Sequence, residues 1–329
     1  MTTTWGVFTG TSEPHDGISA LPPPPPWRLA PPRENKAVSD GVEDRPGGTY
    51  RAGPPEIEAV NAALYLRRPL LVTGPPGVGK SSLADAVTRE LKLGEVLRWP
   101  ITTRSTLQEG LYAYDAIGRL QDINIQKLTS DASVDLSAIG KYIRLGPLGT
   151  ALLPSRTPRV LLMDEIDKSD IDLPNDLLHV FEEGQFTISE LARIAAKEPE
   201  VEVLTWDSQP ARIVQGRVIR DAFPLVILTS NGERDFPAAF LRRCIRLTIK
   251  QPDRAQLEQI VAAHLDTWFP AELRPTVDML ITEFLQRRTQ AGGNLATDQL
   301  LNAIYLASQP VGVQTHADLL DMLMQSLTS

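Results

Sequence analysis

A glycine-rich stretch ending in lysine and serine is the part of this sequence best suited to bind phosphate. It reads GPPGVGKS over residues 74–81, after the apolar run LLVT (70–73). Glycines allow a tight turn whose N–H groups point at phosphate oxygens, and a following helix adds partial positive charge. The spacing predicts that Lys80 reaches the terminal phosphates of a nucleotide and that the Ser81 hydroxyl binds Mg²⁺. The predicted nucleotide-binding residues are Gly74, Pro75, Pro76, Gly77, Val78, Gly79, Lys80, Ser81 and Ser82.

Two adjacent carboxylates, Asp164 and Glu165, follow a second apolar run, VLLM (160–163). Such a run predicts a buried strand that delivers both groups to one edge of a sheet. Beside a phosphate loop, a carboxylate at the end of a neighbouring strand holds Mg²⁺, and we assign this role to Asp164. Glu165 is then available to orient and deprotonate an attacking water. The pair therefore favours hydrolysis over nucleotide binding alone.

A possible guanine-reading motif, DKSD (167–170), follows at once. It lacks the first Asn or Thr of that motif and has no strand of its own, so we expect ATP and not GTP.

Alternating apolar runs and amphipathic stretches from residue 55 onward predict an α/β fold. Strands are expected at 70–73, 95–101, 160–164, 225–230 and 244–249. Helices are expected at 56–66, 80–91, 173–184, 253–268, about 272–290, 297–308 and 315–327. We predict a P-loop NTPase parallel sheet domain (55–250), followed by a small C-terminal helical domain (251–329) and preceded by a proline-rich N-terminal extension (1–54).

The extension contains LPPPPPWRLAPP at 21–32, which predicts a polyproline II segment, either a spacer or a docking ligand for a partner. Its aromatic residues Trp5, Phe8 and Trp27 are unusual for a disordered segment, so we expect part of it to pack on the core.

The bulk composition narrows the class of protein. A net charge of −8 argues against non-specific adhesion to nucleic acid or membranes. The single cysteine, Cys244, excludes a disulfide within the chain, and no histidine has metal-ligand spacing, so we expect no zinc site. No signal-peptide pattern and no apolar run of the ~20 residues that a membrane span needs are present. We expect a cytoplasmic protein.

With both motifs placed, the chain resembles AAA+ ATPases, and among them the MoxR group, over roughly residues 55 to 310. The stretches that carry the resemblance are LLMDEIDKSDIDLPNDLLHVFEEGQFTI (161–188) and YIRLGPLGTALL (142–153). The resemblance implies Mg²⁺-dependent ATP hydrolysis, a helical lid, a homo-oligomeric ring, expected to be a hexamer, and chaperone-like remodelling or activation of a partner protein. It suggests a von Willebrand factor A domain protein as that partner, and a bacterial conflict or defence system as one setting.

The resemblance also assigns three further site residues. Asn231, after LVILTS (225–230), falls at the sensor 1 position, where an amide contacts the γ-phosphate or the attacking water. Arg242 and Arg243 fall at the finger position, where one arginine reaches the nucleotide of the neighbouring subunit. Arg243 aligns better, but the order Arg-Arg-Cys leaves the choice open. Asp298 or Gln299 stands where relatives carry a sensor 2 arginine.

Two regions are longer than the family pattern requires. Residues 189–224 form an enlarged insert with one predicted helix and further strands. GLYAYDAIGRLQDI (110–123) predicts a hairpin turning at DAIGR. Tyr112 and Tyr114 are then either exposed aromatics facing the axis of the ring or residues packed on their own domain.

Two other functions stay open. One is a nucleotide-gated switch or binding module with little turnover, which the altered sensor 2 position allows. The other is a nucleic-acid-dependent AAA+ loader or translocase, against which the acidic composition weighs.

Overall fold

A five-stranded parallel sheet forms the centre of the computed structural model, which describes residues 7–20, 48, 50–129, 137–265, 274–290 and 295–307. Its strands are β1 (Leu70–Thr73), β2 (Leu97–Pro100), β5 (Val160–Asp164), β10 (Leu225–Ser230) and β11 (Ile245–Thr248). They lie in the order β11-β1-β10-β5-β2, and every neighbouring pair is parallel. These are the five predicted strands, with small differences at their ends.

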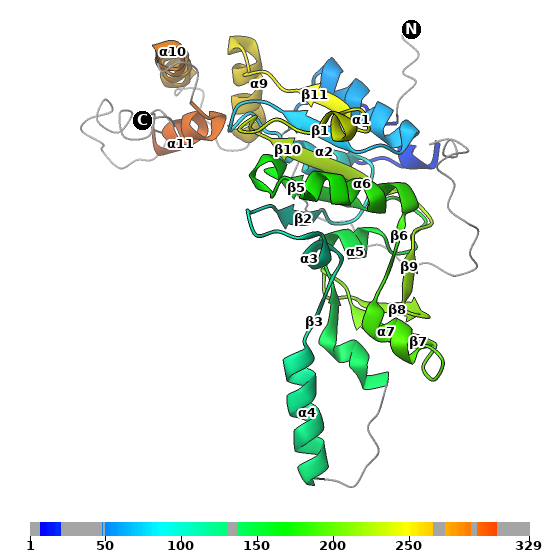
Figure 1. Cartoon of the computed structure of the whole chain (residues 1–329). Coiled ribbons are helices and arrows are strands. Elements are labelled where there is room, and N and C mark those ends of the chain that lie inside the picture. The colour runs from blue at the N-terminus through cyan, green and yellow to red at the C-terminus, as the bar shows by residue number, and fades with distance from the viewer. Residues whose placement is uncertain are drawn as a thin grey trace.

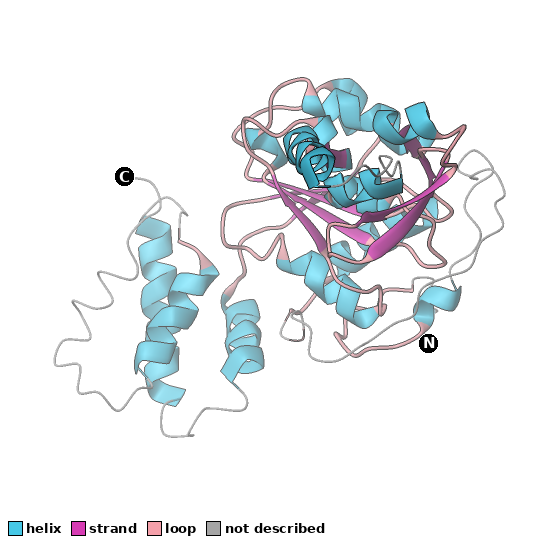
Figure 2. Ribbon diagram, turned by 90° about the horizontal axis from the view of Figure 1, so that it is seen from below, coloured by secondary structure: helices cyan, strands magenta, loops and turns pink. Residues whose placement is uncertain are grey.

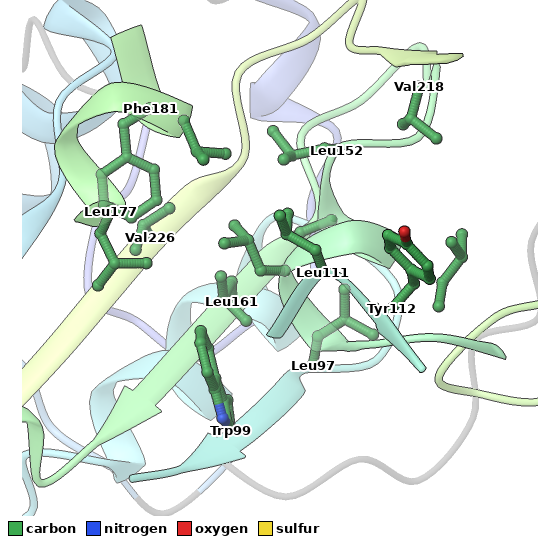
Figure 3. Packing of buried hydrophobic residues seen from close by; sticks show 14 of the residues in the cluster. Leu97, Trp99, Leu111, Tyr112, Leu152, Leu161, Leu177, Phe181, Val218 and Val226 are labelled. Atoms are coloured by element: carbon green, nitrogen blue, oxygen red, sulfur yellow. The ribbon is translucent and has the colours of Figure 1, made fainter. Parts of the chain in front are cut away.

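Both faces of this sheet are covered, so its three inner strands β1, β10 and β5 are almost entirely buried, whereas the edge strands β2 and β11 alternate buried and more exposed residues. On one face Leu70 and Val72 pack with α1 (Pro54–Leu66) and α2 (Ser82–Glu90). On the other, Leu71 belongs to a cluster that includes α5 (Pro147–Ala151) and α6 (Leu173–Glu183). Successive side chains of a strand point to opposite faces, which explains this division. Figure 2 shows helices on both sides of the sheet, and Figure 3 shows part of the second cluster around Leu161 and Trp99.

The parallel arrangement fixes where chemistry can occur. The carboxyl ends of β1, β5 and β10 lie at one edge, because all three strands run in the same direction. The segments that follow them, which hold the phosphate loop, the carboxylate pair and Asn231, therefore meet at that edge.

A second sheet lies beside the first; β3 and β7–β9 come from the two enlarged regions, and β4 and β6 from segments next to them (Figure 1). It has the order β3-β4-β7-β8-β9-β6, and most of its pairs are antiparallel. Its strands are β3 (Tyr112–Tyr114), β4 (Ile143–Leu145), β6 (Gln185–Thr187), β7 (Glu200–Leu204), β8 (Pro210–Val214) and β9 (Arg217–Ile219). Its helical elements are α3 (Leu107–Leu111), α4 (Ala116–Thr129), the 3₁₀ helix η3 (Ser137–Tyr142) and α7 (Ser189–Ile194).

The predicted hairpin over 110–123 is wrong. Tyr112–Tyr114 does form a strand, but its antiparallel partner is β4, and α4 begins where the turn was expected. Asp115 acts as a helix cap and not as a turn residue, because its Oδ1 accepts from the Gly118 N–H at 2.8 Å. Tyr112 is also not exposed: it is buried, stacks on Phe186, and donates its hydroxyl to Glu190 Oε2 at 3.0 Å. Tyr114 is half-buried against the same cluster, and its hydroxyl accepts from Arg119.

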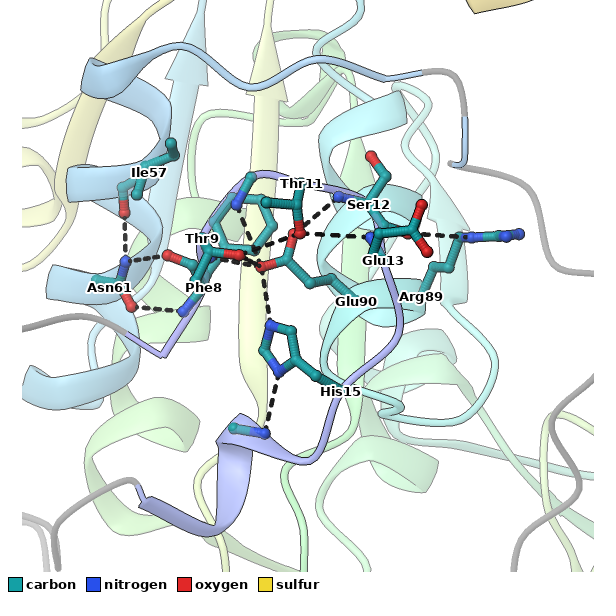
Figure 4. A network of polar contacts seen from close by, with 12 residues as sticks. Phe8, Thr9, Thr11, Ser12, Glu13, His15, Ile57, Asn61, Arg89 and Glu90 are labelled. Carbon is teal, nitrogen blue, oxygen red and sulfur yellow. Dashed lines mark hydrogen bonds and ion pairs between the residues drawn. The ribbon is translucent and has the colours of Figure 1, made fainter. Parts of the chain in front are cut away.

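Residues 7–20 pack on the sheet domain, as the sequence predicted for part of the extension. Val7 and Phe8 are buried with α1 and α2, and the Asn61 side chain of α1 bonds to both the N–H and the C=O of Phe8. The chain then wraps around Glu90, at the end of α2, and enters the 3₁₀ helix η1 (Gly17–Ala20). The Glu90 carboxylate is fully buried and accepts from backbone or side-chain groups of four residues, Thr9, Gly10, Ser12 and His15 (Figure 4). This carboxylate clamp ties the segment to the helix that follows the phosphate loop.

In the described residues after the central sheet lie the helices α9 (Arg254–Leu265), α10 (Arg274–Gln290) and α11 (Thr297–Ala307). They share a hydrophobic cluster of their own, which includes Leu257, Phe284 and Leu300. Within the described part of the chain, no helix combines the length and the apolar character that crossing a membrane needs. Trp5, the proline run with Trp27, and the predicted helix at 315–327 lie outside the described residues.

Candidate functional site

The phosphate loop occupies the turn between β1 and α2. Gly77 has a φ of 72°, and a Cβ placed there would lie 2.2 Å from the Cβ of Ala296 at the start of α11. Gly74 has a φ of 151°, and a Cβ there would lie 2.3 Å from the Ile249 carbonyl oxygen. Only glycine fits both the backbone conformation and the space at these two positions. The loop is therefore pressed between the end of the sheet and the helices that follow it.

Lys80 lies within this loop, and all three N–H donors of its ammonium group have an oxygen acceptor. Its Nζ donates to the carbonyl oxygens of Gly74 and Pro75, each at 2.8 Å, and to Asn231 Oδ1 at 2.7 Å. Burial lowers the pKa of Lys80, while the negative charges of Asp167, Asp164 and Glu165 act in the opposite direction. A cation fixed in this way can exchange its acceptors for phosphate oxygens without first being ordered.

Ser81 and Asp164 form an oxygen pair suited to a hard cation. The Ser81 hydroxyl donates to Asp164 Oδ1 at 2.7 Å, and the Thr229 hydroxyl of β10 donates to the same oxygen. A hydroxyl and a carboxylate are the donor types that Mg²⁺ takes, with waters and phosphate oxygens completing its octahedron. These residues therefore fit the predicted ion, which they would hold beside the phosphate loop.

Glu165 adopts a strained backbone conformation at the end of β5. Its φ and ψ are 59° and 49°, in the left-handed region that a non-glycine residue enters at a cost of about 1–3 kcal/mol. Its N–H donates to the Thr229 hydroxyl at 2.9 Å, so this one hydroxyl contacts both members of the carboxylate pair. The Glu165 carboxylate accepts from Lys168 Nζ at 2.8 Å, and this hydrogen bond raises the pKa of Lys168. This bond uses Oε2, so Oε1 is the carboxylate oxygen that, among the described residues, stays available to accept a proton.

A cavity of about 640 Å³ opens beside the carboxylate pair. It is lined by Ile101, Thr102, Thr103, Glu165, Asp167, Lys168, Ser169, Glu233 and Arg234. Asp167 belongs to the short 3₁₀ helix η4 (Ile166–Lys168) and is buried. Its Oδ2 accepts from the backbone N–H groups of Asn231 and Glu233, at 2.9 and 3.1 Å.

The two candidate finger arginines follow α8 (Ala238–Leu241) and have different surroundings. Arg243 forms an ion pair with Glu182 of α6, and its Nη1 donates to the Ala239 carbonyl oxygen at 3.3 Å. Arg242 is exposed, and among the described residues none bonds to its side chain. Arg68 holds the backbone of both through their carbonyl oxygens.

Among the predicted site residues, two pairs meet through direct hydrogen bonds: Lys80 with Asn231, and Ser81 with Asp164, which Glu165 follows in sequence. Within the described chain, Arg242 and Arg243 do not bond to this group. Sequence reasoning missed Thr229, Asp167 and Lys168. The only signals for them are a hydroxyl near the end of a buried strand, and acidic and basic residues directly after the carboxylate pair.

A comparison with protein families matches residues 68–278 to the AAA domain (Cdc48 subfamily), which is well over half of the chain. A search of curated proteins found no match. The matched range begins just before β1 and ends within α10, so it contains the phosphate loop, the carboxylate pair and Asn231. Such a domain implies nucleotide binding and ATP-dependent activity, usually with Mg²⁺. The chain therefore belongs to the AAA domain family, Cdc48 subfamily, and has the fold of an AAA+ ATPase.

Proposed function

We propose that this chain is a MoxR-like, Mg²⁺-dependent ATPase that works as a ring of its own copies and remodels or activates a partner protein. One observation chiefly supports the hydrolytic part. The phosphate loop meets two other segments through direct hydrogen bonds: Lys80 bonds to Asn231 after β10, and Ser81 bonds to Asp164 at the end of β5, beside Glu165. A site built only to bind a nucleotide has no need for a second carboxylate on a strained backbone next to the first.

Each group then has a chemical task. Lys80 binds the terminal phosphates, and Ser81 and Asp164 hold Mg²⁺, which when bound neutralises negative charge on the phosphate oxygens. Glu165 takes the proton of the attacking water through Oε1, the oxygen that does not accept from Lys168. The Asn231 side-chain amide donates to the γ-phosphate or orients that water.

A neighbouring subunit supplies the remaining positive charge through an arginine. The sequence favours Arg243, but the ion pair with Glu182 commits Arg243 to its own subunit. The exposed Arg242 is therefore the better finger, because it can reach outward without breaking a contact.

The helical unit α9–α11 serves as a lid over the nucleotide. The Thr297 N–H lies 3.4 Å from the Gly77 carbonyl oxygen, so the start of α11 contacts the phosphate loop itself. A change in the loop on hydrolysis would then be transmitted to these helices.

A protein fits the partner role better than a nucleic acid. On α4, which extends away from the sheets (Figure 1), Ile117 and Leu120 are 71% and 60% exposed. Apolar side chains on a projecting helix suit contact with a protein, and the net charge of −8 disfavours a phosphate backbone. A von Willebrand factor A domain partner and a defence setting rest on the likeness of residues 161–188 to MoxR proteins.

A nucleotide-gated switch with little turnover is the second candidate. It is favoured by the Glu165–Lys168 contact and by the absence of arginine at 298 and 299. In the structure, Gln299 Oε1 accepts from the Ala296 N–H at 2.8 Å, so this side chain caps the start of α11.

Phosphate release with Mg²⁺-ATP separates the two candidates. The ATPase predicts turnover by the wild type, loss of nucleotide binding in Lys80→Ala, and ATP binding without hydrolysis in Glu165→Gln. Glu233→Gln, a carboxylate on the same cavity, is the matched control and should hydrolyse at the wild-type rate. Tight ATP binding with no release by the wild type, alone and with candidate partners, would identify the switch.

The native mass of Glu165→Gln with Mg²⁺-ATP, with ADP and without nucleotide tests the ring. A shift to about six subunits with ATP alone supports it, and the trapped ring then serves as bait for the partner. A monomer under all three conditions contradicts self-assembly into a ring.

A further inference from the structure

Asp167 lies where the end of β5 meets the turn after β10. Its side chain is nearly inaccessible, with the residue only 5% exposed. One carboxylate oxygen, Oδ2, accepts from two backbone N–H groups of that turn, at Asn231 and Glu233. The other, Oδ1, is buried with no hydrogen-bond partner among the described residues.

The turn held in this way carries a residue of the candidate site. Asn231 uses its backbone N–H for Asp167 and its side-chain oxygen for Lys80 Nζ. Asp167 therefore anchors the main chain from which the Asn231 amide reaches the phosphate loop. A shift of this turn would displace the amide directly, since a short side chain has little reach to compensate.

Simple strand termination does not require a buried carboxylate here. Ser230 already accepts the Gly232 N–H at 3.0 Å, so the turn has a local side-chain bond of an ordinary kind. A buried carboxylate is costly unless all its lone pairs are satisfied, and Asp167 Oδ1 is not. Charge-assisted bonds are, however, shorter and stronger than neutral ones, which suits a group that must hold a backbone in one position.

We infer that Asp167 is a positioning residue that fixes the Asn231 backbone. The side-chain amide of Asn231 is then placed to detect whether a γ-phosphate is present and to align the attacking water. This role rests on the proposed ATPase function. It adds to that function a structural link between β5, which ends at the carboxylate pair, and β10, which Asn231 follows. In this role Asp167 acts through the Asn231 backbone and not as a catalytic residue.

Two readouts follow, and only one requires turnover. In a Glu165→Gln background, the ratio of ADP to ATP dissociation constants measures how well the site detects the γ-phosphate. Asp167→Ala should bring this ratio within about threefold of unity and leave ADP affinity unchanged. With Glu165 intact, Asp167→Ala should lower kcat by about 100-fold, the cost expected of a misplacement near 1 Å, with KM changed by less than about threefold. Asp167→Asn keeps an acceptor of the same shape and should lose about 10-fold or less.

A double-mutant cycle with Asn231→Ala tests whether Asp167 acts through Asn231. If it does, Asp167→Ala/Asn231→Ala is no slower than Asn231→Ala alone. Effects that multiply would overturn the inference, as would a changed KM at constant kcat. Asp170→Asn, an exposed carboxylate three residues along the same loop, is the matched control and should match the wild type.

Two further measurements distinguish a failure of the inference from a failure of the variant to fold and from a failure of the proposed ATPase function. If Asp167→Ala does not fold, Asp167→Asn is used with thermal unfolding as the check, and a large loss of stability without loss of ATP/ADP discrimination would assign Asp167 a structural role only. If the wild type does not hydrolyse ATP, the proposed ATPase fails. The discrimination ratio still decides whether Asp167 positions Asn231.

Discussion

Replacing Glu90 by glutamine should loosen the N-terminal segment from the sheet domain. The buried Glu90 Oε1 accepts from the Thr9 N–H and hydroxyl, from the Gly10 N–H at 3.1 Å and from His15 Nε2 at 3.2 Å. Oε2 accepts from the Ser12 N–H at 3.2 Å. A glutamine amide has the same shape but only one acceptor atom, and it carries no charge.

The expected cost has two parts. The bonds kept by the amide oxygen weaken from charge-assisted to neutral strength, a loss of about 1 kcal/mol for each strong one. The Ser12 N–H then faces an NH₂ group and is left unsatisfied, at about 1–3 kcal/mol. Burying a neutral side chain costs less free energy than burying a charged one, which offsets part of this loss. The contributions of hydrogen bonds within one network are also not additive. We expect the free energy of unfolding to fall by about 3 kcal/mol.

Urea unfolding followed by tryptophan fluorescence measures this loss. With a slope of about 3 kcal/mol/M, the midpoint should fall by about 1 M. Glu95→Gln, an exposed glutamate just beyond α2, should change stability by less than about 0.5 kcal/mol. A Glu90→Gln protein as stable as this control would refute the reasoning, because the carboxylate clamp would then hold nothing.

Three further predictions concern the site and its surroundings. Gly77→Ala should weaken ATP binding by at least about 10-fold in a fluorescent-nucleotide titration, since the new Cβ would collide with Ala296 at a positive φ; unchanged affinity would mean that the loop shifts freely. Burial raises the pKa of the Cys244 thiol to about 12, so at pH 8 it is almost entirely protonated and should react with a disulfide reagent only after unfolding, as followed by thionitrobenzoate release. Arg242→Ala should lose ATPase activity and regain it in rings mixed with Glu165→Gln subunits, which have an intact finger. Arg243→Ala should instead cost up to about 1 kcal/mol of stability through its partly exposed ion pair, and the reverse outcome would reassign the finger.

The sequence by itself determined the sheet and the chemistry at its edge. Runs such as LLVT and LVILTS are short, apolar and bounded by turn residues, which favours buried strands, and GPPGVGKS and the Asp164–Glu165 pair directly follow apolar runs of this kind. Local spacing suffices here because parallel strands bring their carboxyl ends to one edge whatever lies between them. Asn231 was assigned to the site by the family resemblance, and in the structure it bonds to Lys80 at this edge.

Only the tertiary structure decided the contacts between segments distant in sequence. Whether Asp115 begins a turn or caps a helix depends on β3 pairing with β4 across the whole of α4, and local pattern favoured the wrong answer. Glu90 looks like an ordinary polar residue near a helix end until residues 9–15 wrap around it. The different surroundings of Arg243, which pairs with Glu182, and of the exposed Arg242 are likewise visible only in the structure. Hydrogen bonds and ion pairs of this kind leave no periodic trace in the sequence, because their partners are chosen by the fold and not by spacing along the chain.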